Sequence, residues 1–219
     1  MKKLLLAAAL LAAFAAKAQT TTYGFTGSLG AFKTINSSSS AGADFNYAPG
    51  LQLQLGSWVQ LPVSEKATLQ LTLVHSIERQ GGSKVTMTDE NRNPLANVKT
   101  RYGNLAIGAT AVYLRHLSDK LALGAGAGVT YKYVSLMAVQ DFKMAGIAKA
   151  ELAKTYDDRY HRKFNAYLPV EVQYGLSPRV TLRGQLQVPL SNRIAASESA
   201  FKERDLGLAV GVNYILVRQ

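Results

Sequence analysis

The feature that most constrains this chain is a period of two in hydrophobicity that recurs in eight stretches. In each stretch, apolar or aromatic residues occupy every second position, and the positions between are rich in Gln, Thr, Asn and Gly. A period of two is typical of a β-strand whose two faces meet different surroundings. The stretches are 21–33, 47–62, 66–79, 100–116, 120–134, 163–176, 179–190 and 204–217.

The connections between these stretches alternate in length. Three are tight and carry turn-forming residues, namely 63–65, 117–119 and 177–178. Four are long, namely 34–46, 80–99, 135–162 and 191–203. Within the third, 143–154 has some helical periodicity interrupted by Gly146, and the alternative is that this connection extends the fifth and sixth stretches above the membrane. An up-and-down barrel with both chain ends on one side requires this alternation. We therefore predict an all-β fold, an eight-stranded antiparallel up-and-down transmembrane β-barrel with short periplasmic turns and long extracellular loops.

Aromatic residues on the apolar face favour a membrane barrel over a soluble one. They fall near the ends of the predicted strands, whereas the middle of the same face is aliphatic or small. Two aromatic girdles around an aliphatic band suit a barrel that sits between two headgroup regions. The predicted girdle residues are Tyr23, Tyr113, Tyr174 and Tyr214 near the short turns, and Tyr47, Tyr131, Tyr133 and Phe164 near the long loops.

Two places depart from the simple pattern. Trp58 falls by parity on the polar face of its strand. The stretch 100–116 is ambiguous because both of its faces carry apolar residues. A β-bulge near Gly108 or Tyr113 would shift the parity there.

The first residues read as an export signal. Lys2 and Lys3 precede an apolar run that ends in Ala16-Lys17-Ala18, a small-x-small cleavage site. The run is shorter than the roughly 20 residues of a transmembrane helix. We therefore assign 1–18 to a signal peptide and 19–219 to the barrel domain. The chain has no Cys, so we expect neither a lipid anchor on cysteine nor a disulfide.

The charge of the chain suggests its partners. The signal contains three of the 25 Lys and Arg residues, so 22 remain against 14 Asp and Glu, a charge of about +8. We expect contacts with outer-membrane lipid and lipopolysaccharide rather than with nucleic acid. Ordinary solvated loop charge is the alternative. Candidate lipopolysaccharide contacts are Arg79, Lys84, Lys99, Arg101, Arg162, Lys163, Arg193 and Lys202.

The interior of an eight-stranded barrel is narrow enough for side chains to fill it. A wide diffusive pore is therefore not expected. The tight turn at 177–178 brings Glu171 and Arg183 roughly opposite each other on adjacent strands, both on the polar face. Because an unpaired charge in a narrow lumen is costly, we predict an ion pair between them. Separate hydration of each group by lumen water is the alternative.

A short motif in the last stretch adds a resemblance. Gly211-Val-Asn-Tyr214-Ile-Leu216 looks like the C-terminal strand signal that the outer-membrane assembly machinery recognises. The whole pattern resembles the small Gram-negative outer-membrane β-barrel proteins of the porin family or outer-membrane beta-barrel domain, with OmpA/OmpX-type architecture. The resemblance covers essentially all of the chain after the signal. It implies an outer-membrane location and recognition during assembly through Gly211, Tyr214 and Leu216.

The sequence offers little catalytic chemistry. His75 and Ser76 are adjacent in a strand, so they lie on opposite faces and cannot form a nucleophile–base pair. His161 lies in a predicted loop, and no residues have metal-ligand or phosphate-loop spacing. We expect no cofactor and no enzymatic activity.

Our leading interpretation is a monomeric barrel with a structural or surface-interaction role. A lipid A-modifying enzyme that uses His75 or His161 is one alternative. A soluble periplasmic lipocalin-like binder is another.

Overall fold

The computed structural model describes residues 21–38, 48–88, 94–144, 152–155, 162–193 and 201–218. Within these ranges the chain forms nine β-strands. They are β1 (Thr22–Ser38), β2 (Gly50–Ser64), β3 (Ala67–Thr88), β4 (Pro94–His116), β5 (Leu121–Met144), β6 (Leu152–Thr155), β7 (Phe164–Ser177), β8 (Val180–Pro189) and β9 (Phe201–Arg218). Over the same ranges there is no helix of the length and apolar character needed to cross a membrane.

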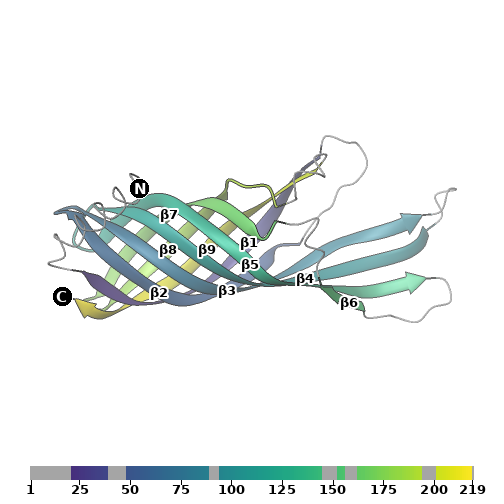
Figure 1. Cartoon of the computed structure of the whole chain (residues 1–219), viewed down its shortest axis with the longest axis horizontal. Coiled ribbons are helices and arrows are strands. Elements are labelled where there is room, and N and C mark those ends of the chain that lie inside the picture. Colours follow the sequence, from purple (N-terminus) through teal and green to yellow (C-terminus); the bar gives the residue numbers. More distant parts are fainter. Residues whose placement is uncertain are drawn as a thin grey trace, which may run out of the picture.

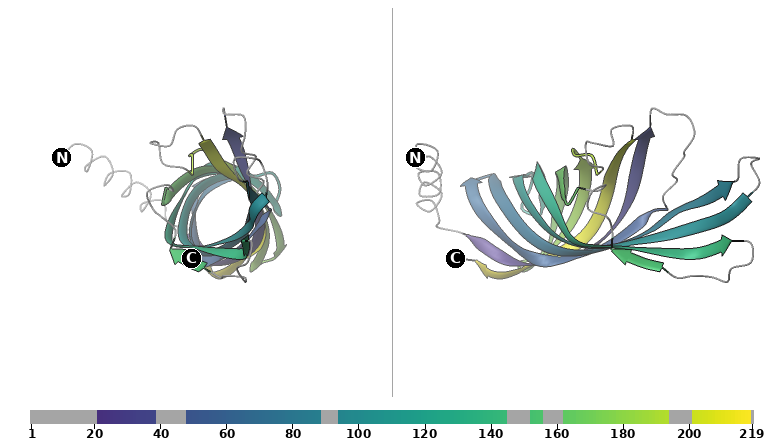
Figure 2. Two further views of the ribbon diagram at one scale, coloured as in Figure 1. Left: turned by 90° about the vertical axis from the view of Figure 1, so that its right-hand side faces the viewer. Right: turned by 45° about the vertical axis from the view of Figure 1, so that its right-hand side comes forward.

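Eight of the strands close into a barrel, as predicted (Figure 1). All pairs are antiparallel, and sequence neighbours are paired around the wall. The wall closes because the first and last strands, β1 and β9, pair along their length. The end-on view shows the resulting ring, with β6 outside it (Figure 2). We call the rim with the tight connections 65–66, 117–120 and 178–179 the turn end, and the opposite rim the loop end.

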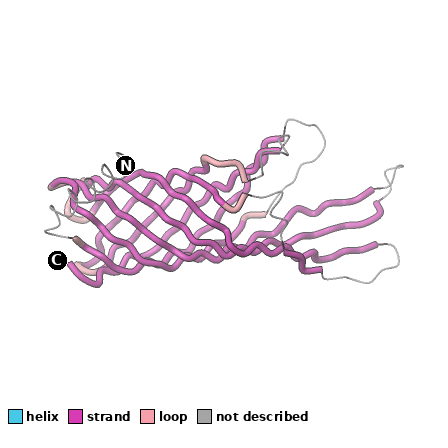
Figure 3. The backbone as a smooth tube through the Cα atoms, in the orientation of Figure 1, coloured by secondary structure: helices cyan, strands magenta, loops and turns pink. Residues whose placement is uncertain are grey.

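On one side the barrel wall continues beyond the loop end as a four-stranded sheet (Figure 3). We call this sheet the tongue; it consists of 82–88 of β3, 94–100 of β4, 135–144 of β5, and β6. The long connections 80–99 and 135–162 are therefore strand over much of their length, and for 135–144 this is the extension of the fifth stretch that the sequence left open.

The two faces of the barrel wall are as predicted. Glutamines such as Gln52 and Gln54 are buried inside, whereas the alternate residues lie outside. Leu51 on the outer face of β2 is 70% exposed, and Val210 of β9, on the other side of β1, is 62% exposed. A soluble calyx would direct these rows into its centre. The outer surface is instead a continuous apolar belt.

Both unusual places in the sequence have a structural explanation. Trp58 points into the lumen, as its parity indicates, and its Nε1–H donates to the carbonyl of Phe25 at 3.0 Å. In β4, Val112 and Leu114 also point inward, where they pack with Ala122 in a small apolar cluster. The strand has two apolar faces because this cluster fills the lumen at that level.

The predicted place of the β4 irregularity was wrong. Parity is regular through both Gly108 and Tyr113, and the register changes between Leu105 and Ala106. Leu105 lies opposite Val134, and Ala106 lies opposite Lys132, so the extra residue belongs to β5. That residue is Tyr133, which is exposed on the outer face.

Candidate functional site in the lumen and outer mouth

The polar interior of the barrel is organised around two groups of charged residues. The first lies in the β7–β8 hairpin, where Arg183 Nε is 2.9 Å from Glu171 Oε2. The structure thus brings the predicted pair together. Glu171 lies opposite Gln185 and Arg183 lies opposite Gln173, so the contact is diagonal rather than directly across the strands. Both charged side chains are almost inaccessible to solvent.

Amides complete this inner group and cross the lumen. Gln173 Nε2 donates to Glu171 Oε1 at 2.6 Å, and Gln185 Nε2 donates to Glu171 Oε2 at 3.2 Å. From the other side of the barrel, Gln60 Nε2 donates to Gln70 Oε1 at 2.8 Å. Gln173 Nε2 also lies 2.8 Å from Gln70 Oε1. The network therefore links β2 and β3 to β7 and obstructs the lumen.

A second group, which we call the outer-mouth cluster, consists of Glu78, Lys132, Arg193, Glu203 and Asp205. Lys132 Nζ lies 3.1 Å from Glu78 Oε2 and 3.6 Å from Asp205 Oδ2. Arg193 Nη1 lies 3.0 Å from Asp205 Oδ1, and Arg193 Nε lies 3.8 Å from Glu203 Oε2. The cluster joins residues of β3, β5, β9 and the segment after β8, so it ties together distant parts of the wall.

Neutral side chains donate further hydrogen bonds to Asp205 and Glu78 of the outer-mouth cluster. Thr34 Oγ1 donates to Asp205 Oδ1 at 2.7 Å. Asn104 Nδ2 donates to Glu78 Oε2 at 3.1 Å, and Gln52 Nε2 donates to its Oε1 at 3.4 Å. Burial of charge in a protein requires this kind of pairing and hydrogen bonding. The arrangement is that of a packed plug.

Arg193 holds the segment after β8 over the mouth. Its backbone N–H donates to the carbonyl of Glu203, and its own carbonyl accepts from the N–H of Arg162, both at 2.8 Å. The space beneath it is about 50 Å³ and is bordered by Glu78, Lys132 and Asp205, among others. A space of that size has room for a water molecule or two but not for an ordinary solute.

Arg193 therefore does not lie on the exposed rim where we placed it from the sequence. Its side chain is 6% exposed, and two carboxylates of β9 face it. The sequence analysis missed the outer-mouth cluster as a unit. The available signal was the inward parity of Glu78, Lys132 and Asp205 near the same rim. What the sequence does not show is that a connecting segment folds inward to add Arg193.

The other predicted lipopolysaccharide contacts divide into two sets. Lys84 and Lys99 lie opposite each other on the tongue, and their side chains are outside the described part. The remaining residues are exposed at or beyond the loop end, namely Arg79, Arg101, Arg162, Lys163 and Lys202. Their contact with lipopolysaccharide stays a prediction.

The predicted girdle residues that are described lie on the outer face. Tyr131 packs against Phe164 with ring centroids 4.7 Å apart. Tyr47 lies outside the described residues. The others are exposed, namely Tyr23, Tyr113, Tyr133, Phe164, Tyr174 and Tyr214. In the proposed assembly signal, Gly211 is inside the barrel, and Tyr214 and Leu216 are outside.

The histidines form no recognisable reaction centre. His75 is exposed on the outer wall, whereas Ser76 is buried on the inner face. His116 Nε2 lies 3.4 Å from Thr68 Oγ1 near the turn end. His161 lies outside the described residues. In the part of the chain that is described, no group of three or more His, Cys, Asp or Glu residues could hold a metal ion.

No protein-family model matches the sequence, and no curated protein matches it. Solved structures with a similar fold include Ail of Yersinia pestis in complex with sucrose octasulfate, with 9% identity, 89% of this chain and 99% of that chain covered, and a TM-score of 0.43. Neisserial surface protein A has 15% identity, 88% and 97% coverage, and a TM-score of 0.43. The outer-membrane protease OmpT of Escherichia coli has 12% identity, 90% and 95% coverage, and a TM-score of 0.41. At these values, function has to be argued from the geometry of this chain itself.

Proposed function

We propose that this chain is an integral outer-membrane barrel that does not conduct solutes and that displays the tongue outside the cell as an interaction surface. The observation that carries the proposal is the combination of an apolar outer belt with a lumen crossed by buried polar groups. We include in the proposal the removal of residues 1–18 on export and recognition of the last strand by the assembly machinery.

The outer belt supports membrane insertion. Its middle is aliphatic, with exposed residues such as Leu29, Leu51 and Leu208, and aromatic residues lie toward both rims. Soluble monomers seldom expose more than a few hundred Å² of continuous apolar surface. In a bilayer the same belt contacts lipid chains, and the pairing of β1 with β9 closes the wall so that neither end strand has an open edge in hydrocarbon. The soluble lipocalin-like alternative requires the opposite placement of these faces.

The lumen supports a non-conducting role. The inner group around Glu171, the apolar cluster around Leu114 and the outer-mouth cluster occupy successive levels of the interior. A solute would have to displace buried ion pairs at more than one level. Removing one partner from such a pair is costly because the other charge is left without compensation.

The tongue supports an interaction role. Among the described residues, 82–88 of β3 pair only with β4, and β6 pairs only with β5. Each of these strands therefore presents one edge of N–H and C=O groups that an extended segment of another protein could pair with. The exposed basic residues nearby, Arg79 and Arg101, would favour anionic surfaces such as lipopolysaccharide.

A non-enzymatic role fits the placement of the candidate catalytic residues. His75 faces away from the lumen and Ser76 faces into it, so neither can activate the other. Replacement of His75 and of His161 by Ala, with lipid A mass spectra compared with those of a deletion strain, tests this part. Altered lipid A in either variant would support the enzymatic alternative.

The orientation is tested with an epitope tag on intact cells. A tag inserted between Thr88 and Pro94, at the tip of the β3–β4 hairpin, should be accessible to antibody without permeabilisation. The matched control is the same tag in the turn 117–120, which should be accessible only after permeabilisation. The reverse result, or access to both tags in washed cells, would contradict the proposal. Purified chain in planar bilayers should show no stable conductance steps.

A further inference from the structure

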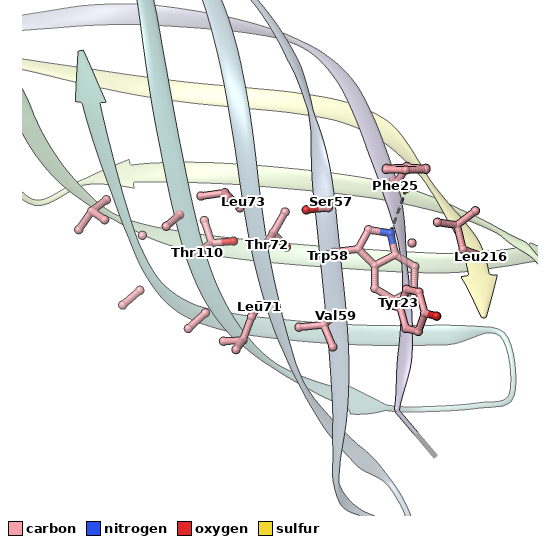
Figure 4. Close-up of a pocket in the computed structure, with 16 residues that line it drawn as sticks. Tyr23, Phe25, Ser57, Trp58, Val59, Leu71, Thr72, Leu73, Thr110 and Leu216 are labelled. Carbon is pink, nitrogen blue, oxygen red and sulfur yellow. Dashed lines mark hydrogen bonds between the residues drawn. The ribbon is translucent and has the colours of Figure 1, made fainter. Parts of the chain in front are cut away.

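The outer wall of the barrel contains a furrow of about 740 Å³ that crosses five strands, β1 to β5. Two rows of outward side chains form its banks, and the rows are continuous in the strand register. One row runs from Phe25 to Val129, and the other runs from Tyr23 to Ala127. The row between them has its side chains directed into the lumen, so its backbone forms the floor. Figure 4 shows these three rows, with Trp58 and Thr72 in the middle one.

Small side chains on the banks make the furrow deep. Where most of the belt carries Leu or Val, the banks have Ser57 on β2, Ala109 and Ala111 on β4, and Ala127 on β5. The volume lies within the range of roughly 300–1,000 Å³ that is typical of pockets for small ligands. Its lining is almost entirely apolar, so hydrocarbon is the chemistry that fits it.

The direction of the furrow matches one leaflet of a bilayer. Tyr23 lies next to the start of β1 at the turn end, whereas Val129 lies well inside β5. Four strand spacings of about 4.8 Å give a length of roughly 19 Å. With strands tilted by about 35–45°, the furrow rises roughly 11–13 Å. One leaflet contributes about 15 Å of hydrocarbon, so the furrow runs from the turn-end interface almost to the midplane.

The rim where the furrow meets the turn end is basic. Arg179 is exposed in the β7–β8 turn, and its carbonyl accepts a hydrogen bond from the N–H of Ile215 on β9. Arg218 lies opposite Thr22 in the β1–β9 register. The described acidic residues of the turn end, Glu65 and Asp119, belong to the other two turns. This end therefore suits a phosphate group.

We propose that the furrow binds one acyl chain of an anionic phospholipid of the periplasmic leaflet, with the lipid phosphate at the turn-end rim beside Arg179. The inference rests on the membrane insertion proposed above. The furrow would be a site that prefers one class of lipid, on an apolar belt that elsewhere contacts lipid without preference.

The chain provides its own reporter of this site. Trp58 is the one Trp in the sequence, and it lies in the floor of the furrow. The purified full chain is inserted into phosphatidylcholine vesicles that contain a small fraction of phosphatidylglycerol with brominated chains. A parallel series contains brominated phosphatidylcholine at the same fraction. Bromine quenches Trp fluorescence only at short range, so quenching of Trp58 reports lipid in the furrow. An Arg beside an anionic headgroup favours binding by roughly fivefold, so brominated phosphatidylglycerol should quench at a correspondingly lower fraction than brominated phosphatidylcholine.

Two pairs of variants locate the lipid. Ala127→Leu fills the furrow and should make the two lipids quench alike, whereas Ala31→Leu, on the outer face of β1 outside the furrow, should behave as wild type. Arg179→Gln should lower the preference for phosphatidylglycerol by about fivefold. Arg115→Gln, at the same rim on β4, should not change it.

Other outcomes overturn the inference in distinguishable ways. Equal quenching by both lipids in the wild-type chain would overturn this inference alone. Absence of quenching by either lipid, with no heat-dependent gel shift, would overturn membrane insertion as well. A cross-linked dimer that Ala127→Leu abolishes would show that a second copy of the chain occupies the furrow. Loss of preference in Arg115→Gln instead of Arg179→Gln would contradict the proposed position of the phosphate.

Discussion

Lys132 of β5 lies 3.1 Å from Glu78 of β3, although β4 separates the two strands in the wall. The contact therefore passes through the lumen behind β4. Both side chains are more than nine-tenths buried, and Lys132 also faces Asp205 of β9. One ammonium group thus compensates carboxylates from both sides of the barrel.

Replacing Lys132 with Met should destabilise the barrel by about 3–5 kcal/mol, because Glu78 would remain buried without the cation that pairs with it. Urea unfolding in detergent micelles measures the difference. Lys202→Met, at an exposed position of β9, is the matched control and should change stability by about 0–1 kcal/mol. Similar effects of the two substitutions would mean that the outer-mouth cluster is hydrated and contributes little.

The Glu171–Arg183 pair should show strong coupling in a double-mutant cycle. Arg183→Met alone should cost about 3–5 kcal/mol, since it leaves the Glu171 carboxylate buried without its cation. Glu171→Leu combined with Arg183→Met should recover most of that loss, because replacement of both partners by apolar groups is often close to neutral. Unfolding free energies of the two single variants and the double variant decide the matter. Additive losses would contradict a direct pair.

Charge on the outer belt should be costly at mid-depth. Leu186 faces outward from β8, and Leu186→Arg should destabilise the inserted barrel by about 2–4 kcal/mol. The neighbouring Gln187 faces the lumen, where its Nε2 donates to Gln185 Oε1, and Gln187→Ala should cost about 1 kcal/mol. Folding titrations into vesicles provide the comparison. If the two losses were equal, the assignment of inner and outer faces would be wrong.

Gly24 should be intolerant of a side chain. It lies beside a register shift between β1 and β9, and a Cβ there would meet the carbonyl oxygen of Tyr214. Gly24→Ala should cost about 1–3 kcal/mol through this overpacking. Gly103→Ala is the control, because the nearest atom to its Cβ would be 3.9 Å away. The urea midpoints should fall for the first variant and change little for the second.

The strands of the barrel wall could be predicted from the sequence, whereas the tongue and the outer-mouth cluster could not. Positions such as Leu51, Trp58 and Leu208 could be placed because each strand of the wall separates two different surroundings, and this separation imposes alternation on the residues. In β4 the rule lost its power because Val112 and Leu114 make the lumen locally apolar. Where both faces of a strand are apolar, the sequence does not show which face points into the lumen.

The same reasoning explains the errors at the loop end. Residues 82–88 and 94–100 pair with each other beyond the closed wall, where no lumen lies on one side, so the contrast that defines the wall strands does not apply to them. Arg193 was predicted as a lipopolysaccharide contact because it is a basic residue of a long connection. Its burial depends on the approach of Glu203 and Asp205, two carboxylates of another strand, and no local rule predicts that approach.

The seal between β1 and β9 has a consequence for biogenesis. Its partners, such as Thr22 and Arg218, stand at opposite ends of the described chain, so the ring is completed by its most distant contacts. A wall that has not yet closed therefore has two unpaired strand edges, and each can pair wrongly with another chain. The cylinder can shut only when both Thr22 and Arg218 are in place, so the wall forms its last pairing between residues that are far apart in the sequence.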